Sequence, residues 1–105
     1  MTQTSIFVKL MFQPGKRDEG IAALEKMLPV VADEPGTLVY SFHLDASDEN
    51  TLWIFELYSD GDALAAHGGS EGMKDVMKAF GELTAEPPLF VMATPTPGGN
   101  KGLPS

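Results

Sequence analysis

The order of the hydrophobic patterns along the chain limits its possible folds more than any other feature. Four segments, residues 5–12, 37–44, 51–58 and 89–93, are rich in the β-branched and aromatic residues typical of strands. Between the first and second, and between the third and fourth, apolar residues recur at spacings of three and four, as in amphipathic helices. This order predicts an α+β, ferredoxin-like βαββαβ fold, in which helices cover one face of an antiparallel four-stranded sheet.

Local signals set the expected bounds of the two helical regions. In the first region Pro29 is expected to kink the helix, because its ring displaces the hydrogen bond to the Glu25 carbonyl. In the second region Asp60 is a good N-cap for a short helix, and Ser70 caps a longer one after the glycine pair at 68–69. The expected apolar faces consist of Ile21, Leu24, Leu28 and Val31 in the first region and Met73, Val76, Met77, Phe80 and Leu83 in the second.

The length and composition fit one small domain. With 105 residues, of which 43% are hydrophobic, the chain can bury one core. We assign residues 1–93 to this domain. Residues 94–105 are rich in Pro and Gly and have no core-forming pattern, so a flexible tail is predicted there.

Charge and residue usage exclude several classes of protein. The formal net charge is -8 and Lys and Arg do not cluster, so binding to nucleic acid is not expected. No apolar run approaches the ~20 residues of a membrane span, and the first residues lack a signal-peptide pattern, so we expect a cytoplasmic protein. Because the chain has no cysteine and two histidines, a metal site is not expected.

The two faces of the central strands indicate how the sheet is covered. Alternate side chains of a strand point to opposite faces, and in residues 51–58 both faces are largely apolar. Two helices cover one face only, so Trp53, Phe55 and Leu57 would form an exposed apolar patch on the other. A second copy packed about a two-fold axis is the simplest cover, and we predict a homodimer. The alternative, that the tail folds back over the patch, is disfavoured because the tail has few apolar residues.

Three segments, in order along the chain, resemble one protein family. Residues 34–40 (EPGTLVY), 52–58 (LWIFELY) and 63–70 (ALAAHGGS) are similar to segments of the antibiotic biosynthesis monooxygenase-like domains. The resemblance spans residues 5–93 and implies a dimeric α/β barrel, with a pocket between each sheet and its own helices. Some members of that family are cofactor-independent oxygenases of quinols or polyketide phenols. Others degrade haem, isomerise small sugar-derived signals or have no assigned reaction.

Glu56 and His67 are the candidates for acid–base catalysis. Glu56 is the one ionisable residue in an apolar strand, so burial would raise its pKa and make it a usable acid or base. His67 ends the short helix on the stripe of Ala63 and Leu64 and should face the sheet, where a neutral imidazole can take a phenolic proton. The resemblance implies a contact between the two. The alternatives are structural: Glu56 only positions the pocket wall, and His67 interacts with the helix dipole.

Five aromatic or imidazole residues are candidates for contact with a substrate. Tyr40, Phe42 and Tyr58 share the face of Glu56, and the tyrosine hydroxyls either orient a ring substrate or are satisfied within the packing. His43 and Trp53 are expected on the opposite face of the sheet. They are better explained as residues of the dimer interface, although family members also place Trp in their pockets.

These features favour an oxidoreductase, a monooxygenase that needs no cofactor and acts on a small aromatic quinol or phenol. In that chemistry the deprotonated substrate supplies the electrons to oxygen, and the protein provides a base, an apolar pocket and exclusion of water. A small-molecule isomerase with the same Glu–His pair and a non-catalytic dimeric ligand-binding module are the alternatives. Haem degradation is disfavoured, because the haem degraders use an Asn in the first strand and this chain has Asn only at 50 and 100.

Overall fold

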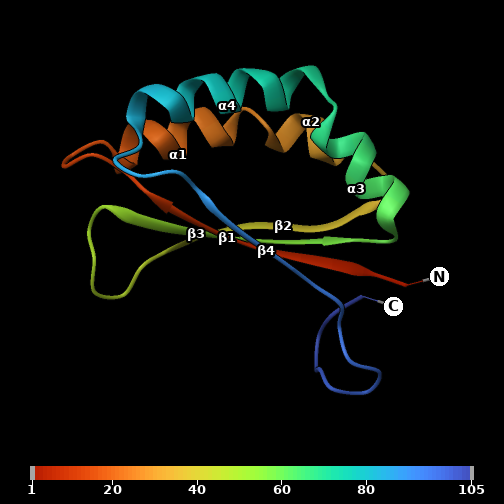
Figure 1. Ribbon diagram of the computed structural model, residues 1–105. Helices are drawn as coiled ribbons and strands as arrows, with labels where there is room; N and C mark the ends of the chain where they lie inside the picture. The colour runs from red at the N-terminus through yellow and green to blue at the C-terminus, as the bar shows by residue number, and fades with distance from the viewer. Residues whose placement is uncertain (1, 105) are drawn as a thin grey trace.

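An antiparallel four-stranded sheet forms the centre of the computed structural model, which describes residues 2–104. The strands lie in the order β2-β3-β1-β4, and all neighbouring strands run antiparallel. They are β1 (Thr4–Met11), β2 (Thr37–Leu44), β3 (Thr51–Tyr58) and β4 (Leu89–Ala93). With β1 and β3 central and both helical crossovers on one face, the ferredoxin-like fold predicted from the order of the patterns is confirmed (Figure 1).

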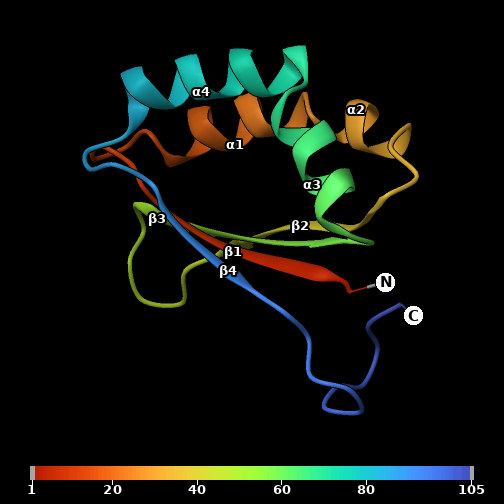
Figure 2. The ribbon, with the colours of Figure 1, turned by 45° about the vertical axis from the view of Figure 1, so that its right-hand side comes forward.

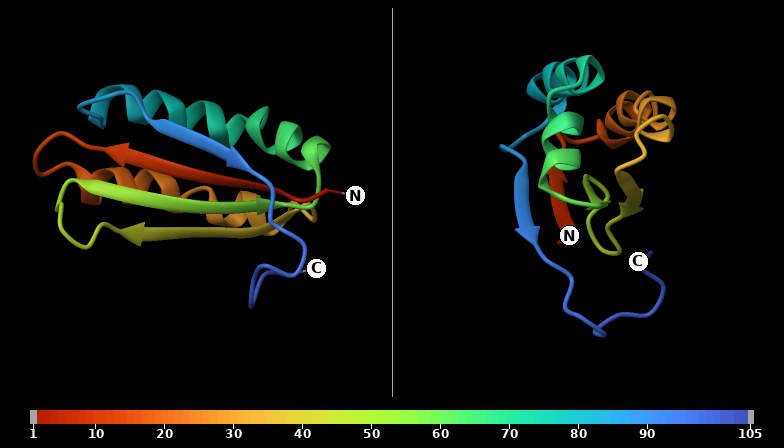
Figure 3. Two further views of the ribbon diagram at one scale, coloured as in Figure 1. Left: turned by 60° about the horizontal axis from the view of Figure 1, so that its bottom comes forward. Right: turned by 90° about the vertical axis from the view of Figure 1, so that its right-hand side faces the viewer.

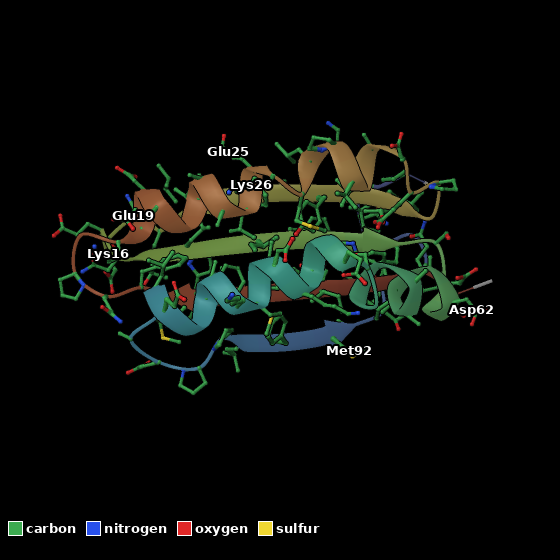
Figure 4. All side chains as sticks on the ribbon, turned by 90° about the horizontal axis from the view of Figure 1, so that it is seen from above. Lys16, Glu19, Glu25, Lys26, Asp62 and Met92 are labelled. Atoms are coloured by element: carbon green, nitrogen blue, oxygen red, sulfur yellow. The ribbon has the colours of Figure 1, made fainter. Side chains whose placement is uncertain are left out.

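The helices form a second layer above the sheet, and the view from above shows α4 beside α1 (Figure 4). Within residues 2–104 the helices are α1 (Arg17–Glu25), α2 (Leu28–Ala32), α3 (Gly61–Gly68) and α4 (Glu71–Leu83). None of these described helices is both long and apolar enough to cross a membrane.

The first helical region is broken where a kink was expected. The expected single helix is divided: α1 ends at Glu25 and α2 begins at Leu28. Proline has no N–H and its ring clashes with the carbonyl four residues earlier, so Pro29 occupies the first turn of a new helix, where no N–H is needed. The break also changes which side chains of this region point toward the core. Met27 is 1% exposed, whereas Leu28, which we expected to be buried, is 41% exposed.

Both predicted helix caps are confirmed. The Oδ1 atom of Asp60 accepts a hydrogen bond from the Ala63 N–H at 2.8 Å, and Oγ of Ser70 accepts one from the Met73 N–H at 3.3 Å. The Asp60 cap lets α3 begin directly after β3. As a result, the last turn of α3, which contains His67, lies above the ends of the central strands.

The hydrophobic core fills the space between the sheet and the helices. One face of α4 contributes Val76 and Phe80, whereas Met77, predicted on the same stripe, is 45% exposed, because the buried stripe of α4 is narrower than the pattern suggests. The buried core residues are Ile6, Val8, Leu10, Phe12, Leu24, Met27, Leu52, Ile54, Tyr58, Val76 and Phe80.

The opposite face of the sheet has no helices over it (Figure 3). On that face Phe7 is 44% exposed, Trp53 is 37% exposed and Val91 is 46% exposed. The chain after β4 leaves on this side (Figure 2) and returns toward the start of β1, where Nε2 of Gln3 donates a hydrogen bond to the Pro104 carbonyl at 2.7 Å. Leu57, which we expected in the exposed patch, is instead fully buried, and Phe55 is half-buried. The returning segment lines a cavity together with Phe7 and Phe55, so it covers part of this face and leaves Phe7, Trp53 and Val91 exposed.

Candidate active site

Four polar side chains meet where α3 lies over the sheet: Glu34, Glu56, Tyr58 and His67, here called the Glu–His cluster. Glu56 and Tyr58 are two residues apart on β3, so both point toward the helices. His67 points toward them from the last turn of α3. Glu56 is 7% exposed, His67 is 3% exposed and Tyr58 is fully buried. The structure therefore brings together Glu56 and His67, as their strand and helix faces predict.

Glu56 is a buried carboxyl group with one direct hydrogen-bond partner. The Tyr58 hydroxyl donates to its Oε1 atom. Desolvation by burial raises the pKa of Glu56, although the hydrogen bond from Tyr58 and the nearby His67 act in the opposite direction. Because burial is the largest of these effects, Glu56 holds a proton more tightly than an exposed glutamate and is suited to proton transfer.

His67 has different surroundings at its two ring nitrogens. Its Nδ1 atom lies 2.9 Å from Oε1 of Glu34, within hydrogen-bond distance. Its Nε2 atom lies 3.9 Å from Oε1 of Glu56, which is too long for a hydrogen bond. Nε2 is buried and has no hydrogen-bond partner within residues 2–104. Glu56 is therefore close to Nε2 of His67 without bonding to it, and Nε2 can form a hydrogen bond with a third group.

Glu34 is the member of the cluster that the sequence reasoning did not single out. It lies in the connection between α2 and β2, and the Thr37 hydroxyl donates to the same Oε1 atom at 2.8 Å. The contact with His67 joins residues 33 positions apart, so no local spacing reveals it. The one signal in the sequence is that Glu34 opens the family-like segment 34–40.

Aromatic side chains surround the cluster. The rings of Tyr40 and Tyr58 each have their centroid 5.4 Å from that of His67, and Phe42 stacks edge-on against Tyr40 at 5.4 Å. Burial, and next the charge of Glu56, raise the pKa of both tyrosines above the usual range, so their hydroxyls stay protonated. Tyr40, Phe42 and Tyr58 thus form an aromatic wall, in which the Tyr58 hydroxyl donates to Glu56 and the Tyr40 hydroxyl is able to donate to a ligand.

His43 and Trp53, the other two predicted substrate contacts, lie on the far face of the sheet. They are neighbours across the β2–β3 pair, and Nε2 of His43 is 2.8 Å from the Ser41 hydroxyl. The Trp53 indole donates to Oδ1 of Asp45 at 2.7 Å. This bond, together with backbone N–H donors, lowers the pKa of Asp45 to about 2. The sheet therefore separates these two residues from the Glu–His cluster.

Gly36 allows α3 to approach the loop that contains Glu34. A Cβ atom there would lie 2.4 Å from the Ala63 Cβ and 3.2 Å from Oγ of Ser59. We expect Gly36→Ala to push α3 away and to lower the free energy of unfolding by about 1–3 kcal/mol, measured by urea denaturation. Gly61→Ala, in the same helix with open space at its Cβ, is the control. Equal stability of the two variants would show that the close packing is not required.

Glu56 should make stability depend on pH. Its pKa is higher in the folded than in the unfolded protein, so its contribution is complete below the unfolded pKa and is lost as pH rises through the folded pKa. The free energy of unfolding of Glu56→Gln should therefore increase relative to wild type as the pH rises from about 4 toward the alkaline range. Urea denaturation across this range tests it, with Glu25→Gln on the exposed side of α1 as the control. A constant difference would contradict the expectation.

The described residues contain no group of three or more His, Cys, Asp or Glu side chains arranged to hold a metal ion. The chemistry that the cluster itself offers is transfer of a proton. Fold and site together define a class: small ferredoxin-like α+β proteins with a buried carboxyl–imidazole pair between the sheet and its helices. The chain matches the family Antibiotic biosynthesis monooxygenase over residues 5–79, and it belongs to that family.

Individual relatives agree with this assignment. A candidate antibiotic biosynthesis monooxygenase of Caulobacter crescentus CB15 superposes with a TM-score of 0.86 at 29% identity, covering 91% of this chain and 92% of the other. Rv0793 of Mycobacterium tuberculosis gives a TM-score of 0.84 at 26% identity, covering 91% and 97%.

A curated relative, an uncharacterized protein of Synechocystis sp., is 28% identical over 75 residues, which is 71% of this chain and 51% of that protein. The chain therefore spans about half the length of the curated relative that it matches.

Proposed function

We propose that the protein is a cofactor-independent monooxygenase that acts on a small aromatic phenol or quinol at the Glu–His cluster. The observation that carries the proposal is the buried Nε2 of His67, which has no hydrogen-bond partner in the described part of the chain and lies 3.9 Å from the Glu56 carboxyl group. A phenolic O–H placed there would donate to Nε2. The imidazole then acts as the general base, and Glu56 stabilises the imidazolium that forms.

The reaction needs only the substrate and O₂. After His67 takes the phenolic proton, the electron-rich phenolate transfers an electron to O₂, and recombination of the two radicals forms a C–O bond. Loss of water from the hydroperoxide completes the oxidation. For a quinol, one ring C–H becomes C–OH and the two phenol groups become a quinone. The substrate thus gives four electrons to O₂, of which one oxygen atom ends in the product and one in water.

The surroundings of the cluster suit this chemistry. His67 is 3% exposed, so bulk water does not reach the base. The wall formed by Tyr40, Phe42 and Tyr58 offers aromatic ring faces for stacking with the substrate. Tyr40 and Phe42 are half-buried on the edge strand β2, which α2 contacts, and α2 has no fully buried residue. We expect the substrate to enter by displacement of α2 from β2.

Oxygen consumption by the metal-free protein, with a panel of quinols and hydroxynaphthoquinols, tests the proposal. Uptake above the rate of autoxidation, with hydroxylated quinone as product, would support it. Saturable quenching of Trp53 fluorescence without turnover would favour a ligand-binding module. Isomerisation of a hydroxyketone without oxygen uptake would favour the isomerase reaction.

We also propose that a second copy of the chain covers the far face of the sheet. The accessible surface is 6347 Å², whereas a monomer of 11.2 kDa is expected to have roughly 5,700 Å². Part of this excess belongs to the extended segment after β4. The rest fits an uncovered face, on which the rings of Phe7 and Phe55 lie 5.3 Å apart. A self-complementary apolar sheet face is what a two-fold interface requires.

A further inference from the structure

Glu34 connects the buried imidazole of His67 to the surface. Its side chain is 22% exposed and lines a cleft of roughly 420 Å³ formed by residues 33–37 and the start of α3. Its Oε1 atom accepts a hydrogen bond from the Thr37 hydroxyl at 2.8 Å and lies 2.9 Å from Nδ1 of His67. The carboxyl oxygen is thus held in place by one residue while it contacts another.

This contact decides which nitrogen of His67 has the proton. A carboxylate only accepts hydrogen bonds, so the imidazole nitrogen that faces it must be the N–H donor. A neutral ring has one N–H, and therefore Nε2 retains its lone pair. The opposite tautomer would place two acceptors 2.9 Å apart at Nδ1, which is unfavourable.

The other polar groups around His67 do not fix the ring in this way. Glu56 is 3.9 Å from Nε2, beyond hydrogen-bond distance, and the Tyr58 hydroxyl already donates to Glu56. The Tyr40 ring packs beside the imidazole, with a centroid distance of 5.4 Å. Of the groups contributed by β2, β3 and the α2–β2 connection, Glu34 alone forms a hydrogen bond with the His67 ring.

We propose that Glu34 is a positioning residue that holds His67 as the Nδ1–H tautomer and thereby makes Nε2 the proton-accepting atom. The catalytic consequence of this inference rests on the proposed monooxygenase function, whereas the tautomer itself does not. Glu34 touches no reacting atom in this scheme. It determines which side of the imidazole can act as a base.

The tautomer can be measured without a substrate. With two histidines in the chain, the ¹⁵N spectrum of the labelled protein contains two imidazoles, and a His43→Gln sample assigns them. At about pH 8, above the ordinary pKa of an imidazole, wild-type His67 should show a protonated Nδ1 and an unprotonated Nε2. In Glu34→Ala the pattern should change to protonated Nε2, because that nitrogen can then turn toward Glu56. Asp62→Asn, which lines the same cleft without contacting His67, should retain the wild-type pattern.

A His67 ring that is protonated at Nε2 or at both nitrogens in the wild type would overturn the inference, and this result requires no variant to fold. An unchanged pattern in Glu34→Ala would also overturn it. In the oxygen-uptake assay, Glu34→Ala should lower kcat roughly 100-fold, the scale of losing a general base, with KM nearly unchanged. Uptake by the wild type with no change of tautomer in Glu34→Ala would refute the role of Glu34 alone. The expected tautomers without uptake of oxygen would refute only the monooxygenase.

Discussion

Substitution of His67 by alanine is expected to lower kcat for oxygen uptake by roughly 100-fold or more. The reason is that Nε2 of His67 is the unpartnered buried nitrogen of the cluster, and no other base lies at the same position. The Glu56 carboxyl group is 3.9 Å away from Nε2 and already accepts a hydrogen bond from the Tyr58 hydroxyl, so it does not take the place of the imidazole. Initial rates measured with an oxygen electrode, at substrate concentrations on both sides of KM, separate the loss of kcat from a loss of binding.

Two further variants show whether the loss reflects the chemistry. Glu56→Gln keeps the shape of the side chain and an acceptor for the Tyr58 hydroxyl, but it cannot stabilise an imidazolium, so kcat should fall while the protein remains folded. His43→Ala removes the other histidine, which lies on the far face of the sheet. If the reaction takes place under the helices, this variant should retain most of the wild-type rate. A larger loss in His43→Ala than in His67→Ala would place the reaction on the wrong side of the sheet for our proposal.

The fold could be predicted from the sequence because each element has its own local signal. The strands show β-branched and aromatic runs, and the caps Asp60 and Ser70 mark the beginnings of α3 and α4. The prediction failed at the Pro29 break, where two effects compete: the apolar spacing favours one continuous helix, and the missing N–H favours two. The structure has two helices, and Met27, which lies between them, packs in the core, a packing that is not visible in a local pattern.

The site could be predicted in part for the same reason. Parity along β3 placed Glu56 and Tyr58 on one face, and the helical stripe placed His67 opposite them. Glu34 was beyond this reasoning, because its position depends on the path of the α2–β2 connection and on the close contact of Gly36 with Ala63. A connection has no repeating pattern of side-chain directions, so the direction of the Glu34 side chain follows from tertiary packing alone.

The far face of the sheet provides the second large effect. We expect wild-type protein to be a homodimer and Phe7→Lys to dissociate it, because the substitution places a lysine in the centre of an apolar face that also contains Lys9. A central interface residue contributes at least about 2 kcal/mol. Because the interface is two-fold symmetric, the residue contributes from both subunits, about 4 kcal/mol in total. The Kd of the dimer should therefore rise by roughly 1,000-fold. Sedimentation velocity at micromolar concentrations measures the change.

Met77→Lys is the matched control for this experiment. Met77 on α4 is 45% exposed and Phe7 is 44% exposed, so the two substitutions remove a similarly exposed apolar side chain and add the same charge. The two substitutions place the charge on opposite faces of the molecule, Phe7→Lys on the sheet and Met77→Lys on the helix layer. Dissociation by Phe7→Lys but not by Met77→Lys would locate the interface on the sheet. A monomeric wild-type protein would contradict the homodimer, and the far face would then need a different occupant, because the segment after β4 leaves Phe7 and Trp53 exposed.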